Sequence, residues 1–392
     1  MNFKKFKIRP DFLKFSSPHI TKEDIYAVSE ALKSGWLTSG EKTQLFEEKF
    51  AEFIGSKYAV AVSSCTAALF LSLVANDVKP GDEVITTTFT FVSTVNVIHH
   101  LGAIPILVDI KEEDFNIDPL AIQKAISTKT KAIIPVHYSG NPCEMKEIND
   151  MAKKNNIAVI EDAAHAIGAE YDGKNVGSEG NLTCFSLFPT KNITTGEGGV
   201  ITLNDVKIKE RLLKLRLHGM SKDGWKRYRK EGSWYYEIQE PGYKYNMSDI
   251  NAALGLSQIN KIEYLNKRRA SLVKIYSQEL DKIDGIKFIK PKPKNKSSWH
   301  IFPIWINQKV LGLSRNELIN ELWKRNIGTS VHFIPVHYQP FYQQYYGYKK
   351  GDFPVAEKIF EGILSLPLYP GMKDEDVFYV TNAIKDIIKH HP

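Results

Sequence analysis

A single lysine held between two apolar runs constrains this chain more than any other feature. Lys191 lies at the centre of the segment TCFSLFPTKNITTGEGGVITL, residues 183–203. Residues 184–188 predict a short strand before the lysine, and a second strand follows it. Partial burial between two strands lowers the pKa of an ammonium group and frees the amine as a nucleophile. The segment therefore suits a lysine that forms a Schiff base, although a lysine on a surface turn would give the same local pattern.

Much of the chain alternates between apolar strand patterns and helical patterns. This alternation predicts an α/β fold with a mostly parallel sheet covered by helices on both faces. In such sheets ligands bind beyond the carboxyl ends of the strands. The predicted strands are 58–62, 83–88, 104–108, 132–136 and 158–160, and the predicted helices are 17–36, 45–54, 66–75, 93–100, 119–126 and 145–154. Thr21 is a candidate N-cap of the first helix.

The C-terminal third predicts a second, smaller α+β unit. A long helical pattern over residues 248–283 leads into it. A chain of 392 residues is long enough for two or three domains. We expect a large domain of residues 1–265 and a small domain of residues 266–392. The elements expected in the small domain are a strand at 299–306, a helix that begins with the capping-box pattern Ser314-x-x-Glu317, a strand at 329–333 and a helix at 375–388.

A carboxylate pair ends the predicted strand at 158–160. Asp162 follows Glu161 there, and His165 comes three residues later. A carboxylate at this place could hold a proton on a ring nitrogen, but it could also cap a helix or bind magnesium. The chain lacks the G-x-x-x-x-G-K loop of nucleotide hydrolases, and it has no G-x-G-x-x-G that opens a helix. Nucleotide hydrolysis and dinucleotide-dependent oxidation are therefore weak interpretations.

Composition and charge exclude several other classes of protein. The hydrophobic content of 43% and charged content of 25% are typical of a soluble globular protein. The most apolar helical pattern, residues 67–75, is too short to cross a bilayer, and no secretion signal is recognisable. Three cysteines without paired spacing predict neither a disulfide framework nor a zinc site, and we expect no metal site. We therefore expect a cytoplasmic protein.

A formal net charge of +7 raises the question of nucleic-acid binding. The basic residues are scattered among 45 acidic ones, with a cluster at residues 226–230 that aromatic residues flank. Such a cluster could hold a nucleotide diphosphate as well as a nucleic acid, or it could be an exposed basic loop. We expect no nucleic-acid partner.

Five motifs, taken together and in order, give the chain a family resemblance. They are SGWLTSG at 34–40, VSSCTAA at 62–68, EDAAHA at 161–166, FSLFPTKN at 185–192 with GEGG at 196–199, and GYKYNMSDINAALG at 242–255. In this combination the chain resembles the DegT family of pyridoxal 5'-phosphate (PLP) dependent nucleotide-sugar aminotransferases. The resemblance runs from about residue 15 to the C-terminal helix.

The resemblance implies an aspartate-aminotransferase-like large domain, known as PLP fold type I, in a homodimer with shared active sites. Lys191 would bind the cofactor covalently, Asp162 would pair with the pyridinium nitrogen, and His165 would lie near the phenolic oxygen. Relatives in which a histidine replaces this lysine are sugar dehydratases, so Lys191 favours transamination. The remaining residues that the resemblance implies are Phe91 stacked on the ring, Cys65, Thr66 and Ser186 at the phosphate, Asn246 reaching the phosphate from the partner subunit, and Thr38, Arg229 and His332 at the substrate.

Within the family the chain is most similar to enzymes that aminate C4 of a UDP-linked 4-keto sugar, including the 4-amino-4-deoxy-L-arabinose branch. That branch tends to have tryptophan where this chain has Phe91. The expected substrates are glutamate and a nucleotide-linked keto sugar for surface polysaccharide or glycan synthesis. Two alternatives stay open, namely amination at C3 of a dTDP- or GDP-keto sugar and a non-catalytic regulator that binds PLP. His332 and His337 could touch the sugar, or they could be packed or solvated histidines.

Overall fold

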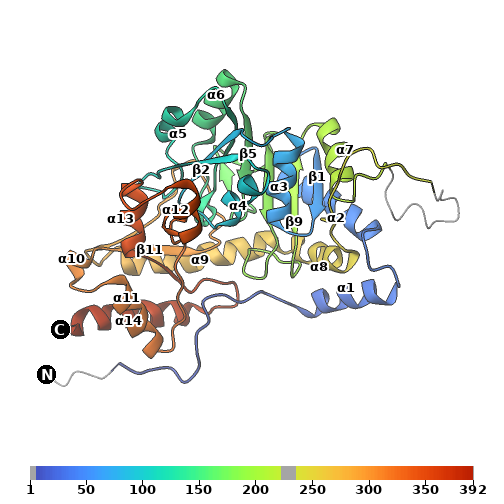
Figure 1. Cartoon of the computed structure of the whole chain (residues 1–392). Helices are drawn as coiled ribbons and strands as arrows, with labels where there is room; N and C mark the ends of the chain where they lie inside the picture. Colours follow the sequence, from blue (N-terminus) through green and yellow to red (C-terminus); the bar gives the residue numbers. More distant parts are fainter. Residues whose placement is uncertain (1–5, 222–234, 392) are drawn as a thin grey trace.

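A seven-stranded sheet forms the centre of the larger part of the molecule (Figure 1). The computed structural model describes residues 6–221 and 235–391. The strand order is β1-β9-β8-β5-β4-β2-β3. The strands are β1 (Tyr58–Val62), β2 (Glu83–Thr87), β3 (Ile104–Val108), β4 (Thr130–Ile134), β5 (Ala158–Asp162), β8 (Leu182–Ser186) and β9 (Gly199–Leu203). Only β9 runs antiparallel to its neighbours in this sheet, so the predicted mostly parallel sheet is present.

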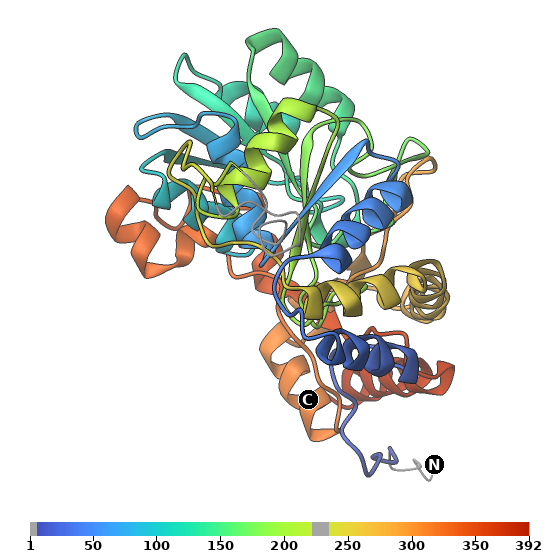
Figure 2. The ribbon, with the colours of Figure 1, turned by 90° about the vertical axis from the view of Figure 1, so that its right-hand side faces the viewer.

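Helices cover both faces of this sheet because its strands are apolar on both sides (Figures 1 and 2). In β1, Val60 and Val62 pack into one core, whereas Ala59 and Ala61 pack into another. Residues of α3 (Cys65–Ala75), α4 (Ser93–His100) and α7 (Val206–Leu215) join the first core. The helices whose residues pack on the opposite face are α2 (Glu41–Ile54), α5 (Pro119–Ala125), α6 (Met145–Asn155) and α8 (Asp249–Ile259).

The C-terminal part has a three-stranded antiparallel sheet and a core of its own. Its strands are β10 (Ile286–Phe288), β11 (Phe302–Ile306) and β12 (Ile363–Leu366), and its helices are α10 (Gln308–Leu311), α11 (Arg315–Lys324), α12 (Pro340–Tyr346), α13 (Pro354–Gly362) and α14 (Asp374–His390). The described residues also form α1 (Lys22–Lys33), the hairpin of β6 (Glu170–Tyr171) and β7 (Lys174–Asn175), and the 3-10 turns η1 (Tyr138–Gly140) and η3 (Val336–Tyr338).

One long helix joins the two parts. α9 (Ile262–Leu280) contributes Ile262 and Leu265 to a core of the large sheet, and Leu272 and Tyr276 to the core of the small sheet. The predicted boundary between residues 265 and 266 lies within this helix and stays a prediction. The N-terminal segment also reaches the small sheet, because Leu13 pairs with Ile327 and is buried in the same core.

Three sequence predictions for the C-terminal third are wrong. The helical pattern at 248–283 is two helices, α8 and α9, with a break at residues 260–261. The strand expected at 299–306 begins only at Phe302, because Trp299 has a left-handed φ of 50°. No strand forms at 329–333, where three consecutive residues line a cavity instead of alternating between two faces. The sequence analysis also missed β12, which pairs with β11.

The helix expected at 17–36 is shorter, since α1 covers Lys22–Lys33, but the two predicted N-caps, Thr21 and Ser314, are correct. The backbone amide of Thr21 donates to the Asp24 side chain at the start of α1, and that of Ser314 donates to Glu317 at the start of α11. In the described ranges 6–221 and 235–391, every helix is too short or too polar to span a bilayer.

Asp249, on α8, caps a different helix and so fixes α2 against α8. Its buried carboxylate accepts hydrogen bonds from the backbone amides of Gly40 and Thr43, at 2.8 and 3.0 Å, and from the Thr43 hydroxyl at 2.7 Å. We expect Asp249→Ala to lower the free energy of unfolding by about 2–4 kcal/mol, since buried donors at a helix start lose their acceptor. Chemical denaturation would measure this change.

Asp118→Ala is the matched control for this prediction. Asp118 caps only its own helix, α5, through the Leu120 amide at a more exposed position. Asp118→Ala should lower the free energy of unfolding by about 1 kcal/mol. Equal losses for the two variants would contradict the role given to Asp249.

Candidate active site

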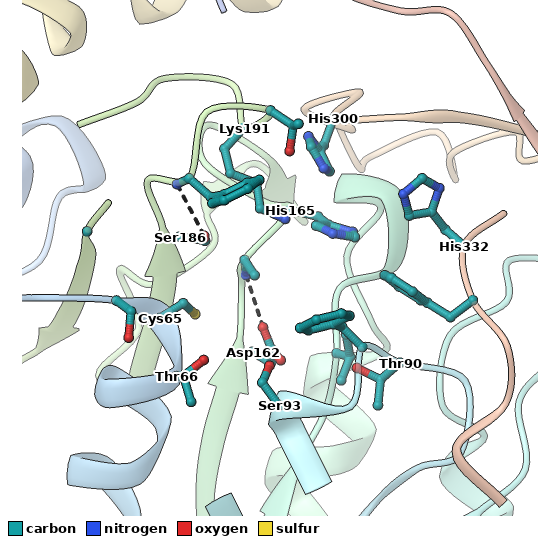
Figure 3. Close-up of a pocket in the computed structure, with 18 of the residues that line it drawn as sticks. Cys65, Thr66, Thr90, Ser93, Asp162, His165, Ser186, Lys191, His300 and His332 are labelled. Atoms are coloured by element: carbon teal, nitrogen blue, oxygen red, sulfur yellow. Dashed lines mark hydrogen bonds between the residues drawn. The ribbon is translucent and has the colours of Figure 1, made fainter. Parts of the chain in front are cut away.

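A cavity of about 430 Å³ opens at the carboxyl ends of the parallel strands (Figure 3). Lys191 and Asp162 both line it, together with residues that follow β1, β2 and β4. The volume is that of a site for a small ligand. The lysine and the carboxylate that the sequence singled out therefore face the same space.

Lys191 lies in the loop between β8 and β9, and hydrogen bonds hold this loop in place. The Lys191 backbone amide donates to the carbonyl of Phe188 at 2.9 Å. The side-chain amide of Asn192, the next residue, donates to the carbonyl of Ser298 and to Oδ1 of Asn266, both at 2.7 Å. Desolvation inside the cavity lowers the pKa of Lys191 to about 8, so about a tenth of the amine is neutral at pH 7, a far larger share than for an exposed lysine. The desolvation expected from the sequence is present.

Asp162 ends β5 and is almost completely buried, with 4% of its surface exposed. Burial raises the pKa of its carboxyl group. Hydrogen bonds from the Thr94 hydroxyl at 2.8 Å and from the Ala164 backbone amide at 3.1 Å oppose that rise. The side chain is thus held in one orientation by two donors, one on each oxygen.

Three histidines line one side of the cavity near Lys191, namely His165, His300 and His332 (Figure 3). The rings of His165 and His300 lie 4.3 Å apart between centroids. Desolvation lowers the pKa of both, and it lowers the pKa of His332 to about 4, so the three rings are neutral at neutral pH. Among the described residues, the Nδ1 atoms of His165 and His300 are buried and have no hydrogen-bond partner. Unpartnered buried nitrogens in a cavity wall indicate a place for a ligand.

The N-terminus of α3 faces the cavity and provides a site for an anion. Ser64 caps this helix through the Ala67 amide at 3.0 Å, and Cys65 and Thr66 line the cavity. A helix start carries free amide groups and a partial positive charge, which favour a phosphate. β9 packs closely here, because a Cβ atom on Gly199 would lie 2.7 Å from the Cys65 nitrogen. Gly199 therefore lets this strand approach the helix start.

The cavity brings together most of the residues that the sequence analysis selected. Besides Lys191 and Asp162, it is lined by Cys65, Thr66, Phe91, His165, Ser186 and His332. Thr38 and Asn246 do not line the cavity of their own chain; the Asn246 amide bonds the Ser39 hydroxyl at 2.7 Å. Arg229 lies outside the described residues. His337 is buried between Thr88 and Glu357, so the interpretation as a packed histidine applies to it.

Three of the residues that sequence reasoning missed bear on the chemistry of this site. His300 and Thr90 line the cavity, and Thr94 bonds Asp162 from behind. A signal was available for Thr90, which lies between the predicted strand at 83–88 and the predicted helix at 93–100. His300 gave no such signal, since it lies inside the strand predicted at 299–306.

The family model described as "DegT/DnrJ/EryC1/StrS aminotransferase family" matches residues 18–385. MJ1066, an uncharacterized protein of Methanocaldococcus jannaschii, is 53% identical over 98% of this chain and 100% of its own length. The spore coat polysaccharide biosynthesis protein SpsC of Bacillus subtilis is 47% identical over 97% of this chain and 98% of its own.

Solved structures of aminotransferases also superpose closely on this chain. The proposed sugar aminotransferase Spr1654 of Streptococcus pneumoniae, in its PMP-form, superposes with a TM-score of 0.89 at 34% identity and covers 96% of this chain and 98% of its own. Its PLP-form superposes with a TM-score of 0.88. Helicobacter pylori PseC, an aminotransferase involved in the biosynthesis of pseudoaminic acid, has a TM-score of 0.89 at 33% identity, over 97% of this chain and 100% of its own. The expected PLP fold type I and the expected PLP dependence are confirmed.

The residues of the cavity fit PLP. An anion site at the start of α3, a buried carboxylate and a desolvated lysine suit the phosphate, the pyridine nitrogen and the aldehyde of this cofactor. The unpartnered Nδ1 of His165 offers one further polar contact.

The lowered pKa of Lys191 gives a testable pH dependence. Below pH 8 the amine of the cofactor-free protein is mostly protonated and unreactive, and above pH 8 it is mostly neutral. We expect the rate of Lys191 acetylation by a small anhydride to rise with pH with a midpoint near 8, as measured by peptide mass spectrometry. Exposed lysines should rise with a midpoint of about 10.4. A midpoint for Lys191 that matches the exposed lysines would contradict its desolvation.

Proposed function

Because this chain belongs to the DegT/DnrJ/EryC1/StrS aminotransferase family, whose members are PLP-dependent sugar aminotransferases, we propose that its substrates are glutamate and a nucleotide-linked keto sugar. The amino group of glutamate is transferred to the C4 keto group of the sugar, and the nucleotide is UDP. The observation that carries the proposal is the desolvated Lys191 amine in the same cavity as the buried Asp162 carboxylate.

Lys191 has two roles in this proposal. Its Nζ anchors the cofactor in the resting enzyme. Once the donor is bound, the free amine takes the proton from the α-carbon of glutamate and later returns a proton to the product. A pKa of about 8 suits both roles, since a general base works best when its pKa lies near the working pH.

The other cavity residues bind and orient. Bound PLP supplies an electron sink for the pair left when the Cα–H bond breaks. Asp162 holds the proton on the pyridine nitrogen, and His165 contacts the phenolic oxygen. Cys65, Thr66 and Ser186 hold the phosphate at the start of α3. The exposed ring of Phe91 stacks on the cofactor ring.

The sugar enters from the side of the cavity where His332 lies. The Nδ1 atom of His332 is hydrogen-bonded to the Ser365 hydroxyl at 2.9 Å, and this bond fixes the imidazole ring in the cavity wall. Arg229 and Thr38 contact the nucleotide sugar in this proposal. The name of SpsC refers to polysaccharide biosynthesis, and it supports a role for this chain in making surface polysaccharide or glycan.

Thr38 and Asn246 reach the cavity of a second subunit in this proposal. Both lie outside the cavity of their own chain, and Asn246 sits beside β1, paired with Val62. In a homodimer with shared sites, Asn246 binds the phosphate in the partner's cavity. The absence of a spanning helix in the described ranges agrees with an enzyme that works in the cytoplasm on soluble nucleotide sugars.

A panel of keto sugars tests the substrate. We expect mass spectrometry to find an amino sugar from a UDP-linked 4-keto sugar plus glutamate, at a kcat/KM at least about tenfold above those of dTDP- and GDP-linked 4-keto sugars and of 3-keto sugars. Preferential amination of a 3-keto sugar would replace the proposal by the C3 alternative. Absence of any product and of any 2-oxoglutarate from glutamate would favour a regulator that binds PLP.

Mixing two variants tests the shared site. We expect Lys191→Ala to lack turnover, because the only amine of the described cavity is lost, and Asn246→Ala to lose at least about tenfold in activity. Random reassortment of the two variants should restore roughly a quarter of wild-type activity, since half of the dimers are hybrids and each hybrid has one intact site. No recovery after proven subunit exchange would exclude a contribution of Asn246 to the partner's site.

A further inference from the structure

Two threonine hydroxyls form a chain behind the carboxylate of Asp162. The Thr94 hydroxyl donates to Oδ2 of Asp162 at 2.8 Å, and the Thr90 hydroxyl lies 2.9 Å from that of Thr94. Both threonines are buried, and Thr94 has no exposed surface. Thr90 lines the cavity, so the chain runs from the cavity wall to the carboxylate.

The direction of this chain follows from the number of protons available. A hydroxyl has one proton to donate. Thr94 gives its proton to Asp162, so between the two threonines Thr94 must accept and Thr90 must donate. Every link therefore points toward the carboxylate, and an acceptor at the end of such a chain is favoured in its ionised form.

Two other groups act on Asp162 through charge, namely Lys191 from the loop after β8 and His137 from the turn after β4, and both lower the pKa of its carboxyl group. Cys65 from α3 and Cys184 from β8 also lie near it, and the charge of Asp162 helps to raise the pKa of both thiols. Among the described residues, the hydrogen bonds to this carboxylate come from the Thr94 hydroxyl and the Ala164 amide. Ala164 is two residues away on the same segment, so Thr94 is the donor that ties Asp162 to a separate element.

The same turn also carries Phe91. Thr94 begins α4 with Ser93, and its backbone amide donates to the carbonyl of Phe91 at 3.2 Å. The position of the aromatic ring and the orientation of the carboxylate are thus set by one short segment after β2.

We propose that Thr94 is a positioning residue, whose hydroxyl, supplied with a hydrogen bond by Thr90, orients the Asp162 carboxylate toward the pyridine nitrogen of PLP and keeps it ionised. The proposal rests on the proposed role of Asp162 and is independent of the sugar. It assigns to α4 a part in holding the cofactor, although Thr94 itself does not line the cavity.

Four variants of the full-length protein test this inference. Thr94→Val keeps the shape of the side chain without the hydroxyl, and Thr94→Ser keeps the hydroxyl. Thr86→Val is the matched control, because the Thr86 hydroxyl is equally buried and donates at 2.8 Å to the Ile134 carbonyl within the sheet. Asp162→Asn is the reference for losing the carboxylate. The readouts are the dissociation constant for PLP, from titration of cofactor-free protein, the visible absorbance of the bound cofactor, and kcat and KM for glutamate.

We expect Thr94→Val to weaken PLP binding by about tenfold and to lower kcat by a similar factor at nearly constant KM, with a changed absorbance spectrum. Thr94→Ser should stay within about threefold of wild type, and Thr86→Val should match wild type. If Asp162→Asn is strongly impaired and Thr94→Val behaves like Thr86→Val, the inference is wrong and the role of Asp162 stands. If Asp162→Asn binds PLP and turns over like wild type, both the inference about Thr94 and the role given to Asp162 are wrong.

Discussion

The desolvation of one amine and one carboxylate in a common cavity is the constraint on which the site depends. Burial lowers the pKa of Lys191 and raises that of Asp162, so each group is pushed toward its neutral form. The amine needs this shift in order to react. The carboxylate must resist it, and the donors from Thr94 and Ala164 provide that resistance. Among the described residues, hydrogen-bond donors thus favour the charged form of the carboxylate, whereas desolvation sets the pKa of the amine.

The architecture of the sheet explains how distant residues meet in this cavity. The strands β1, β2, β4, β5 and β8 run in the same direction, and the residues that follow their carboxyl ends converge at one edge. β9 runs the other way, which returns the chain from the Lys191 loop through Gly198 and Gly199 against the start of α3. The lysine loop is also tied to the C-terminal part, through the bond from Asn192 to Ser298.

The parts of this molecule that could be predicted from sequence are those where local pattern and tertiary structure agree. Apolar strands followed by polar residues placed Lys191, Asp162 and the start of α3 correctly at one edge. The prediction failed where backbone geometry departs from local pattern. Trp299 is in a left-handed conformation and delays β11, and this turn is what brings the His300 ring into the cavity. Thr94 was missed because its partner, Asp162, is 68 residues away, and only the fold brings the two together.

The placement of Leu13 has a consequence for how the chain is made. This residue pairs with Ile327 and shares its core with Ile387, near the other end of the chain. Domains that consist of continuous sequence can fold while the ribosome is still adding residues. Here Leu13 is synthesised well before the other buried members of its core, which begin at Leu272. The segment around Leu13 must therefore wait for the C-terminal part before it can be buried, and this core is complete only once α14 has been added.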